Sequence, residues 1–349
     1  MIVARDPYGD PVTVDAPPST RRRAVRAAIW LVVGLFAWFA LTALVGAVDW
    51  GEVRSAFGEL TWVFAVPLVV LLLARQTLNA VPLTYYVPGL GLRRSMQNDL
   101  SANIVATFTP PPADLVLRVA MFRSWGVDPG SGLAGIALNT AKFYAVRFLA
   151  PTLGIALVAF QGAERRQWLT AILCGLVTVA MLTGLVLVLR GDHLAAWLGR
   201  AAGRIVRPFR SSVDPEAWAT AMIGVRARSA ESLRRGLLPS MLALVGMVLA
   251  DSFILLTALR GCGVQGLSTV DVLSTFLLAY PLTLFPLFGF GLLDAVLVGT
   301  FTTIAGTDQE GAIVAGVVVW RVVTIIGTLL LGAVSVLTWR LSHRDRRSR

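Results

Sequence analysis

Residues 285–294 read FPLFGFGLLD and interrupt an apolar stretch with Pro286, Gly289 and Gly291 before ending at Asp294. Residues 109–114, in the other half of the chain, read TPPPAD and contain a comparable set of breaking residues and a final aspartate: Pro110, Pro111, Pro112 and Asp114. Broken backbone at membrane depth is tolerated only where protein buries it or where it lines a watery cavity. In transporters built from two halves, paired interruptions point to the binding site. The two motifs therefore make transport the first hypothesis.

The composition is that of a membrane protein. The chain has 349 residues, of which 56% are hydrophobic and 15% are charged, and its mean hydropathy is +0.72. Soluble domains carry about 25% charged residues. The composition therefore predicts an all-α membrane protein with several spans, located in the inner (plasma) membrane.

Several other classes of protein are disfavoured by the same composition. The net charge is +11, but the arginines occur in short clusters between apolar stretches, as in cytoplasmic loops that face anionic lipid, so nucleic acid is not expected as a partner. Cys174 and Cys262 have no metal-binding or redox spacing, and the two histidines, His193 and His343, lie far apart. We therefore expect no metal, no cofactor and no enzymatic activity, with an integral membrane enzyme that acts on phospholipid or polyprenyl phosphate as a less favoured alternative.

Apolar runs long enough to cross a bilayer core of about 30 Å recur along the chain. We expect about eight membrane spans, of which the short pair 272–287 and 292–304 forms either two spans or one re-entrant hairpin. The expected spans are 25–48, 60–87, 132–160, 168–189, 237–259, 272–287, 292–304 and 312–339. A cleaved signal peptide is the alternative for 25–48, although this run exceeds the usual apolar core of about 7 to 15 residues.

One transmembrane domain is expected over residues 21–342, between a disordered cytoplasmic tail at 1–20 and a basic cytoplasmic tail at 343–349. Within it, residues 190–236 form a polar interval with nine arginines. Its apolar and basic residues fall on separate helical faces: Leu194, Trp197, Leu198, Ala201 and Ile205 on one, Arg200, Arg204 and Arg207 on another. This pattern predicts an amphipathic cytoplasmic segment on the anionic inner leaflet, with a solvated loop helix as the alternative.

The positive-inside rule places both basic termini and the 190–236 interval in the cytoplasm. In that topology the motif at 109–114 is approached from the cytoplasm, and the motif at 285–294 is approached from outside. Two broken segments approached from opposite sides are what an inverted repeat produces. An inverted repeat is therefore a further hypothesis.

Ionisable residues within or beside the expected spans are the candidate site residues. They comprise five cations and three anions: Arg75, Arg118, Lys142, Arg147, Arg321, Asp114, Asp251 and Asp294. An unpaired charge near the centre of a membrane helix costs about 2.5 to 3.5 kcal/mol, so these groups must pair, reach the interface or line water. Lys142 and Arg147 lie on different helical faces, so only one of them need line a cavity.

Pairing the three carboxylates leaves a surplus of positive charge, which suits an anionic ligand such as a lipid phosphate. The predicted substrate-binding residues are Arg75, Asp114, Arg118, Arg147, Asp251, Asp294 and Arg321. Simpler interpretations stay open: a structural ion-pair network, Arg118 at the inner interface, and Asp114 as a helix cap.

These motifs resemble those of the lysylphosphatidylglycerol synthase transmembrane-region family, the flippase-like proteins related to the N-terminal half of multiple peptide resistance factor. The residues that carry the resemblance are Pro110 to Asp114 with Arg118, Gly289 to Asp294, and the aromatic–arginine pair Trp320-Arg321. Three prolines replace a glycine-rich break at the first motif, and aspartates stand where glutamate is common.

The resemblance implies a flippase, which moves an anionic or modified phospholipid, or a lipid-linked precursor, between leaflets. It implies no synthesis, because the aminoacyl-transfer activity of the relatives resides in a separate soluble domain. An alternative is a non-transporting membrane partner of a lipid- or glycan-modifying enzyme, which would dock through residues 190–236.

Overall fold

A computed structural model describes residues 4–5, 11–12, 62–109, 113–158, 165–206, 214–285 and 289–347. The described residues are almost entirely helical, apart from a small antiparallel ribbon of β1 (Ala4–Arg5) and β2 (Pro11–Val12), which confirms the predicted helical class. The predicted span 25–48 and the prolines Pro110, Pro111, Pro112 and Pro286 lie outside the described residues.

Among the described residues, four helices are long and apolar enough to cross a membrane: Trp62–Tyr86, Pro129–Val158, Arg235–Gly261 and Thr307–Ser342. This fits a membrane protein, while the count of about eight spans stays a prediction. The main helices are α3 Trp62–Tyr86, α4 Leu92–Phe108, α5 Ala113–Ser124, α6 Pro129–Val158, α7 Arg165–Arg190, α8 Asp192–Val206, α9 Pro215–Gly261, α10 Thr269–Ala279, α12 Leu292–Ala305, α13 Glu310–Arg321 and α14 Thr328–Arg347. Shorter segments are η2 Tyr280–Leu284, η3 Thr307–Gln309 and η4 Val322–Gly327.

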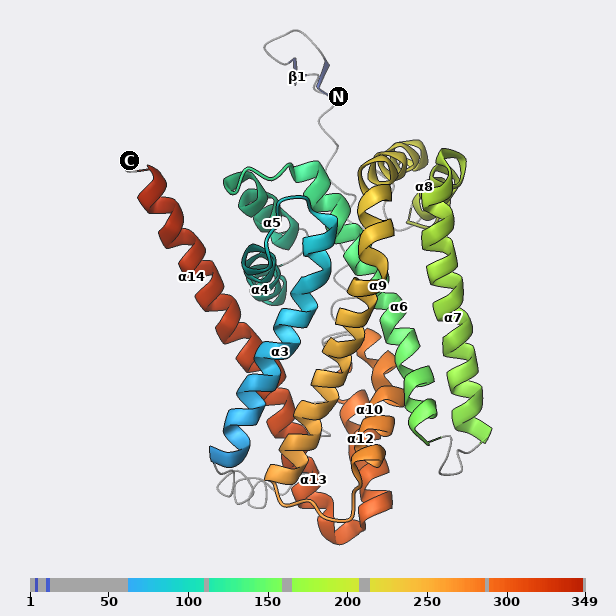
Figure 1. The fold of residues 1–349 in the computed structure, drawn as a ribbon, viewed down its shortest axis with the longest axis vertical. Helices are drawn as coiled ribbons and strands as arrows, with labels where there is room; N and C mark the ends of the chain where they lie inside the picture. The colour runs from blue at the N-terminus through green and yellow to red at the C-terminus, as the bar shows by residue number, and fades with distance from the viewer. Residues whose placement is uncertain are drawn as a thin grey trace.

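Helices α3 and α9 pack along one another at the centre of the fold (Figure 1). At one end of the contact the Tyr86 hydroxyl donates to Ser240 Oγ at 2.6 Å, and further along Arg75 pairs with Asp251 at 3.2 Å. From the first of these contacts to the second, the residue number falls from 86 to 75 in α3 and rises from 240 to 251 in α9. The two helices are therefore antiparallel. We call the face where α3 ends the first face and the face where α9 ends the second face.

Helices α4 and α5 form a hairpin that starts and finishes at the first face. Val87, Phe122 and Val127 share a buried cluster, which joins the end of α3 to the end of α5 and the start of α6. The Arg94 guanidinium lies 5.9 Å from the centroid of the Trp125 ring, which ties the start of α4 to the end of α5. With 17 and 12 residues at about 1.5 Å each, neither helix crosses a core of about 30 Å. The two helices therefore return to the first face without either one being long enough for a complete crossing.

A second hairpin starts and finishes at the second face. Ser268 and Asp271 form a capping box that begins α10, and the Gln265 backbone N–H donates to Gln309 Oε1 at 3.0 Å across the two ends of the hairpin. The chain reverses at Gly289 and Gly291, whose φ angles of 70° and 84° are costly for any residue with a side chain. With 11 and 14 residues, α10 and α12 are also too short to cross. This favours the re-entrant alternative for residues 272–304, and Figure 1 shows the two hairpins in opposite halves of the molecule.

The last helical run contains an irregular segment. Between α13 and α14, η4 is a π-helix, a rare geometry that is frequent at functional sites. Beyond it, α14 packs against α4, where Gln97 Nε2 donates to the Ser335 carbonyl at 3.1 Å and to Thr338 Oγ1 at 3.0 Å. The first hairpin is thus held by the last helix of the chain.

The polar interval at 190–236 is mostly helical rather than an open loop. It contains α8 and the first part of α9, which begins at the N-cap Asp214 and runs unbroken for 47 residues. Helix α8 packs on α9 with Ala196 buried, while the Trp197 side chain is exposed. Arg200 pairs with Glu216 across this contact at 3.1 Å. The amphipathic pattern of residues 194–207 therefore correctly predicted a helix, which is α8. It did not predict that this helix packs on α9.

Candidate functional site

A cavity of about 380 Å³ lies between the tips of the two hairpins. It is lined by residues from both hairpins and from the long helices α3, α6, α9 and α13–α14. The lining residues are Arg75, Gln76, Asn79, Asn103, Thr107, Phe143, Arg147, Met247, Asp251, Tyr280, Thr283, Phe290, Trp320, Arg321, Thr324, Ile325, Thr328 and Leu329. Four of the seven predicted site residues are among them, and they come from four different helices.

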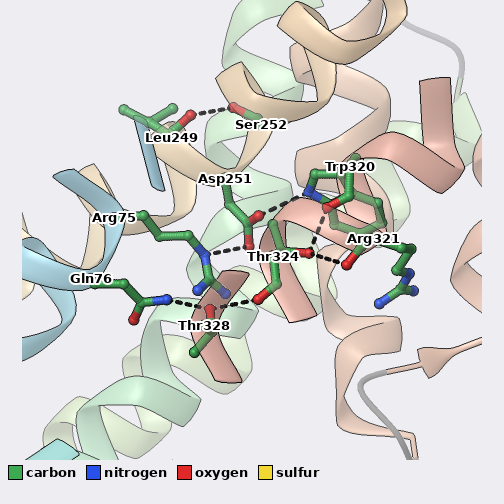
Figure 2. A network of polar contacts seen from close by, with 9 residues as sticks. All are labelled: Arg75, Gln76, Leu249, Asp251, Ser252, Trp320, Arg321, Thr324 and Thr328. Carbon is green, nitrogen blue, oxygen red and sulfur yellow. Dashed lines mark hydrogen bonds and ion pairs between the residues drawn. The ribbon is translucent and has the colours of Figure 1, made fainter. Parts of the chain in front are cut away.

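The first ion pair of the cavity joins α3 to α9. Asp251 is buried, and its Oδ2 lies 3.2 Å from Arg75 Nε. Its other oxygen, Oδ1, accepts a hydrogen bond from Trp320 Nε1 at 2.9 Å, as Figure 2 shows. Both carboxylate oxygens are therefore engaged, and one aspartate connects three helices.

The second ion pair joins the tip of the second hairpin to α13. Arg321 Nε lies 2.7 Å from Asp294 Oδ1, and both side chains are buried. Asp294 Oδ2 accepts the Gly291 backbone N–H at 2.9 Å, so the carboxylate also caps α12. In Figure 2 the Arg321 guanidinium points away from Asp251. Trp320 binds Asp251, whereas its neighbour Arg321 pairs with Asp294. The aromatic–arginine pair thus connects the two ion pairs through adjacent residues.

A chain of hydroxyl groups follows the π segment along the cavity wall. The Thr324 hydroxyl donates to the Trp320 carbonyl at 2.8 Å, and the Thr328 hydroxyl donates to the Thr324 carbonyl at 2.6 Å. Gln76 Nε2 of α3 donates to Thr328 Oγ1 at 2.6 Å. These bonds satisfy carbonyls near the irregular segment and fix it against α3 (Figure 2).

Arg147 is the third arginine of the cavity, and it has a different environment. Its residue is 7% exposed, and its guanidinium carbon lies 4.5 Å and 5.7 Å from the ring centroids of Phe143 and Tyr144. No ion pair within the described part of the chain includes Arg147, and its Nε has no hydrogen-bond acceptor there. The cavity therefore contains three guanidinium groups, while the two carboxylates beside it are Asp251 and Asp294.

The other predicted site residues lie outside this cavity. Arg118 pairs with Asp99 at 2.8 Å and donates to Asn98 Oδ1 at 2.9 Å, which holds α5 to α4. Asn79 of α3 donates to the same aspartate. Asp114 lies in the first turn of α5, and the ion pairs of the described residues do not include it.

Lys142 is fully buried but does not line the cavity. Its Nζ lies 3.3 Å from the centroid of the Tyr86 ring and has no hydrogen-bond acceptor among the described residues. An ammonium over an aromatic face gains a cation–π attraction. Of the two cations on α6, the one that lines the cavity is Arg147.

Sequence reasoning did not identify Asp99 or Tyr280 as part of this region. Asp99 lies in a stretch that reads LRRSMQNDLSANIVATF, which is too polar to be recognised as part of a hairpin inside the fold. Tyr280 lines the cavity between two apolar segments. Tyr280 directly follows α10 and lies a few residues before the broken motif at 285–294. A polar aromatic residue at that place in an apolar stretch is a sequence signal that could have identified it.

Within the described ranges, no three His, Cys, Asp or Glu residues come together as a metal site would require. Comparison with known proteins adds no assignment: no family model matches the chain, and neither a curated protein nor a solved structure does. Any function must therefore be argued from the cavity itself.

Proposed function

We propose that the protein is a flippase, which moves a phospholipid between the leaflets of the inner (plasma) membrane through the cavity between the two hairpins. The observation that carries this proposal is a polar, arginine-rich cavity at the middle of otherwise apolar helices. Arg75 and Asp251 each lie about three turns before the end of a long membrane helix. Charged groups at that depth are expensive and typically mark a substrate pathway.

The surroundings of the cavity favour a lipid over a freely soluble substrate. Thr107 lines the cavity at the tip of α4, and its neighbour Phe108 is 72% exposed. Ile325 and Leu329 also line the cavity, and the residues that follow them, Ile326 and Leu330, are exposed. An apolar rim beside a polar cavity suits a substrate whose head group enters while its acyl chains stay in the bilayer.

The arrangement of elements supports an inverted repeat. α3, the first hairpin and α6 would form one repeat, and the second part of α9, the second hairpin and α13–α14 would form the other. Arg75 and Asp251 then occupy equivalent positions, and so do Asp114 and Asp294, each in the first turn of a returning helix. In this proposal the first face is cytoplasmic, and the cavity opens alternately to the two leaflets as the repeats exchange conformations.

Purified protein in liposomes with a fluorescent phosphatidylglycerol tests the proposal, because dithionite added outside quenches only the exposed leaflet. We expect wild-type vesicles to lose fluorescence beyond the outer-leaflet fraction. The double variant Arg75→Gln/Asp251→Asn should lose this exchange, since it removes the ion pair that joins α3 to α9 in the cavity lining without leaving either partner unpaired.

Arg340→Gln serves as the control, because it removes one arginine at an exposed position of α14 outside the cavity. It should exchange lipid like the wild type. Exchange that is absent from folded wild-type protein would contradict the flippase proposal and favour the alternative of a non-transporting partner of a lipid- or glycan-modifying enzyme.

A further inference from the structure

Each carboxylate oxygen of Asp251 and Asp294, in and beside the cavity, already has a partner within the protein. Asp251 uses one oxygen for Arg75 and the other for Trp320 Nε1. Asp294 uses one oxygen for Arg321 and the other for the Gly291 N–H. An incoming ammonium would have to share a carboxylate with the arginine that it already neutralises, because no carboxylate other than Asp251 is part of the described cavity lining.

Arg147, by contrast, is a cation with no carboxylate partner in the described part of the chain. Its guanidinium carbon lies 4.5 Å and 5.7 Å from the ring centroids of Phe143 and Tyr144, and its buried Nε has no acceptor among the described residues, so this N–H is a donor available to a ligand. Counting Asp251 and Asp294 against the three cavity arginines leaves a surplus of one positive charge. One phosphodiester carries one negative charge, which matches that surplus.

The rest of the polar lining is neutral. It consists of amides and hydroxyls, which both donate and accept hydrogen bonds: Gln76, Asn79, Asn103, Thr107, Tyr280, Thr283, Thr324 and Thr328. Such groups pair with the hydroxyls of a polyol. The volume of about 380 Å³ lies at the lower end of the range of about 300 to 1,000 Å³ for small-molecule pockets. A phosphate with one small polyol suits that volume, and a pyrophosphate with several sugars does not.

We infer, on the basis of the proposed flippase function, that the substrate is a phospholipid with one net negative charge and a small hydroxyl-bearing head group, and that Arg147 binds its phosphate. Lipids whose head group carries an ammonium, such as phosphatidylethanolamine and lysylphosphatidylglycerol, are rejected. The charge of residue 147 therefore sets the specificity of the cavity.

The test compares acyl-labelled phosphatidylglycerol, phosphatidylethanolamine and lysylphosphatidylglycerol in the dithionite assay. Wild-type protein should exchange phosphatidylglycerol roughly tenfold or more faster than either amine-bearing lipid, because all three lipids carry the phosphate but only the amine-bearing lipids bring an ammonium that no further carboxylate balances. Arg147→Gln should lower the phosphatidylglycerol rate by a similar factor. Arg147→Lys should recover part of it, and Arg147→Glu should reverse the ranking in favour of lysylphosphatidylglycerol.

Size-exclusion profiles in detergent show whether each variant folds, and the reversal by Arg147→Glu is a gain that misfolding cannot produce. A wild type that moves lysylphosphatidylglycerol as fast as phosphatidylglycerol would overturn the inference and leave the flippase proposal standing. A wild type that moves no lipid would overturn the flippase proposal itself. Uptake of free glycerol phosphate into the vesicles without lipid exchange would assign the cavity to a soluble organophosphate and would overturn both.

Discussion

The buried ion pair between Arg321 and Asp294 allows a sharp prediction about stability. The Arg321 side chain is 10% exposed and the Asp294 side chain 2% exposed, and their closest atoms are 2.7 Å apart. Removing one partner of such a pair leaves the other buried without its counter-charge, which costs about 3 to 5 kcal/mol. Replacing both partners of the pair by apolar residues of similar size leaves no unpaired charge and avoids that cost. We therefore expect Arg321→Met and Asp294→Leu each to destabilise the protein strongly, and the double variant to be less destabilised than the sum.

The assay is reversible unfolding in mixed detergent micelles, from which a double-mutant cycle gives the coupling free energy. The predicted coupling free energy of the buried pair is about 3 kcal/mol, which is the lower end of the cost of removing one partner of such a pair. The pair of Arg200 and Glu216 provides a control with nearly the same geometry, because its atoms are 3.1 Å apart but its side chains are 35% and 71% exposed. An exposed pair contributes about 0.2 to 1 kcal/mol. Equal coupling energies for the two pairs would refute the reasoning that burial decides their strength.

Two further predictions concern packing and topology. A Cβ on Gly316 would lie 2.9 Å from the backbone of α9, whereas one on Gly184 meets nothing within 4 Å. Gly316→Ala should therefore cost about 1 to 3 kcal/mol in the same unfolding assay, while Gly184→Ala should be neutral or stabilising by up to about 1 kcal/mol; an equally tolerated Gly316→Ala would contradict the packing of α13 on α9. A single cysteine in place of Leu92 should react with an impermeant maleimide from the first face, and one in place of Gln265 from the second face. Labelling of both positions from the same face would contradict the antiparallel arrangement of the two hairpins.

The sequence was informative wherever a local signal determines structure. Proline and glycine break helices by their own backbone chemistry, so the interruptions at 109–114 and 285–294 were visible before any packing was known. Asp294 and Arg321 both stand out in the sequence, because a charge within an apolar stretch must pair, reach the interface or line water. The helical faces of α6 also indicated that either Lys142 or Arg147, but not necessarily both, would reach a cavity.

The choice of partners could not be predicted in the same way. Arg75 meets Asp251 only because α3 and α9 pack antiparallel, and that contact joins positions far apart in the chain. Arg118 was expected at the substrate site, but the fold places it against Asp99, which lies in a polar helix that hydropathy does not assign to the membrane region. Long-range packing decides such pairs, and spacing within one helix contains no information about it.

The most direct test of the central claim is to fill the cavity without changing any charge. Thr107 lines it at the tip of α4, whereas Val334 is 57% exposed on α14 and does not line it. In the dithionite assay, Thr107→Trp should abolish phosphatidylglycerol exchange while Val334→Trp retains the wild-type rate. Full exchange in folded Thr107→Trp protein would show that lipid does not pass through this cavity, and would contradict the account.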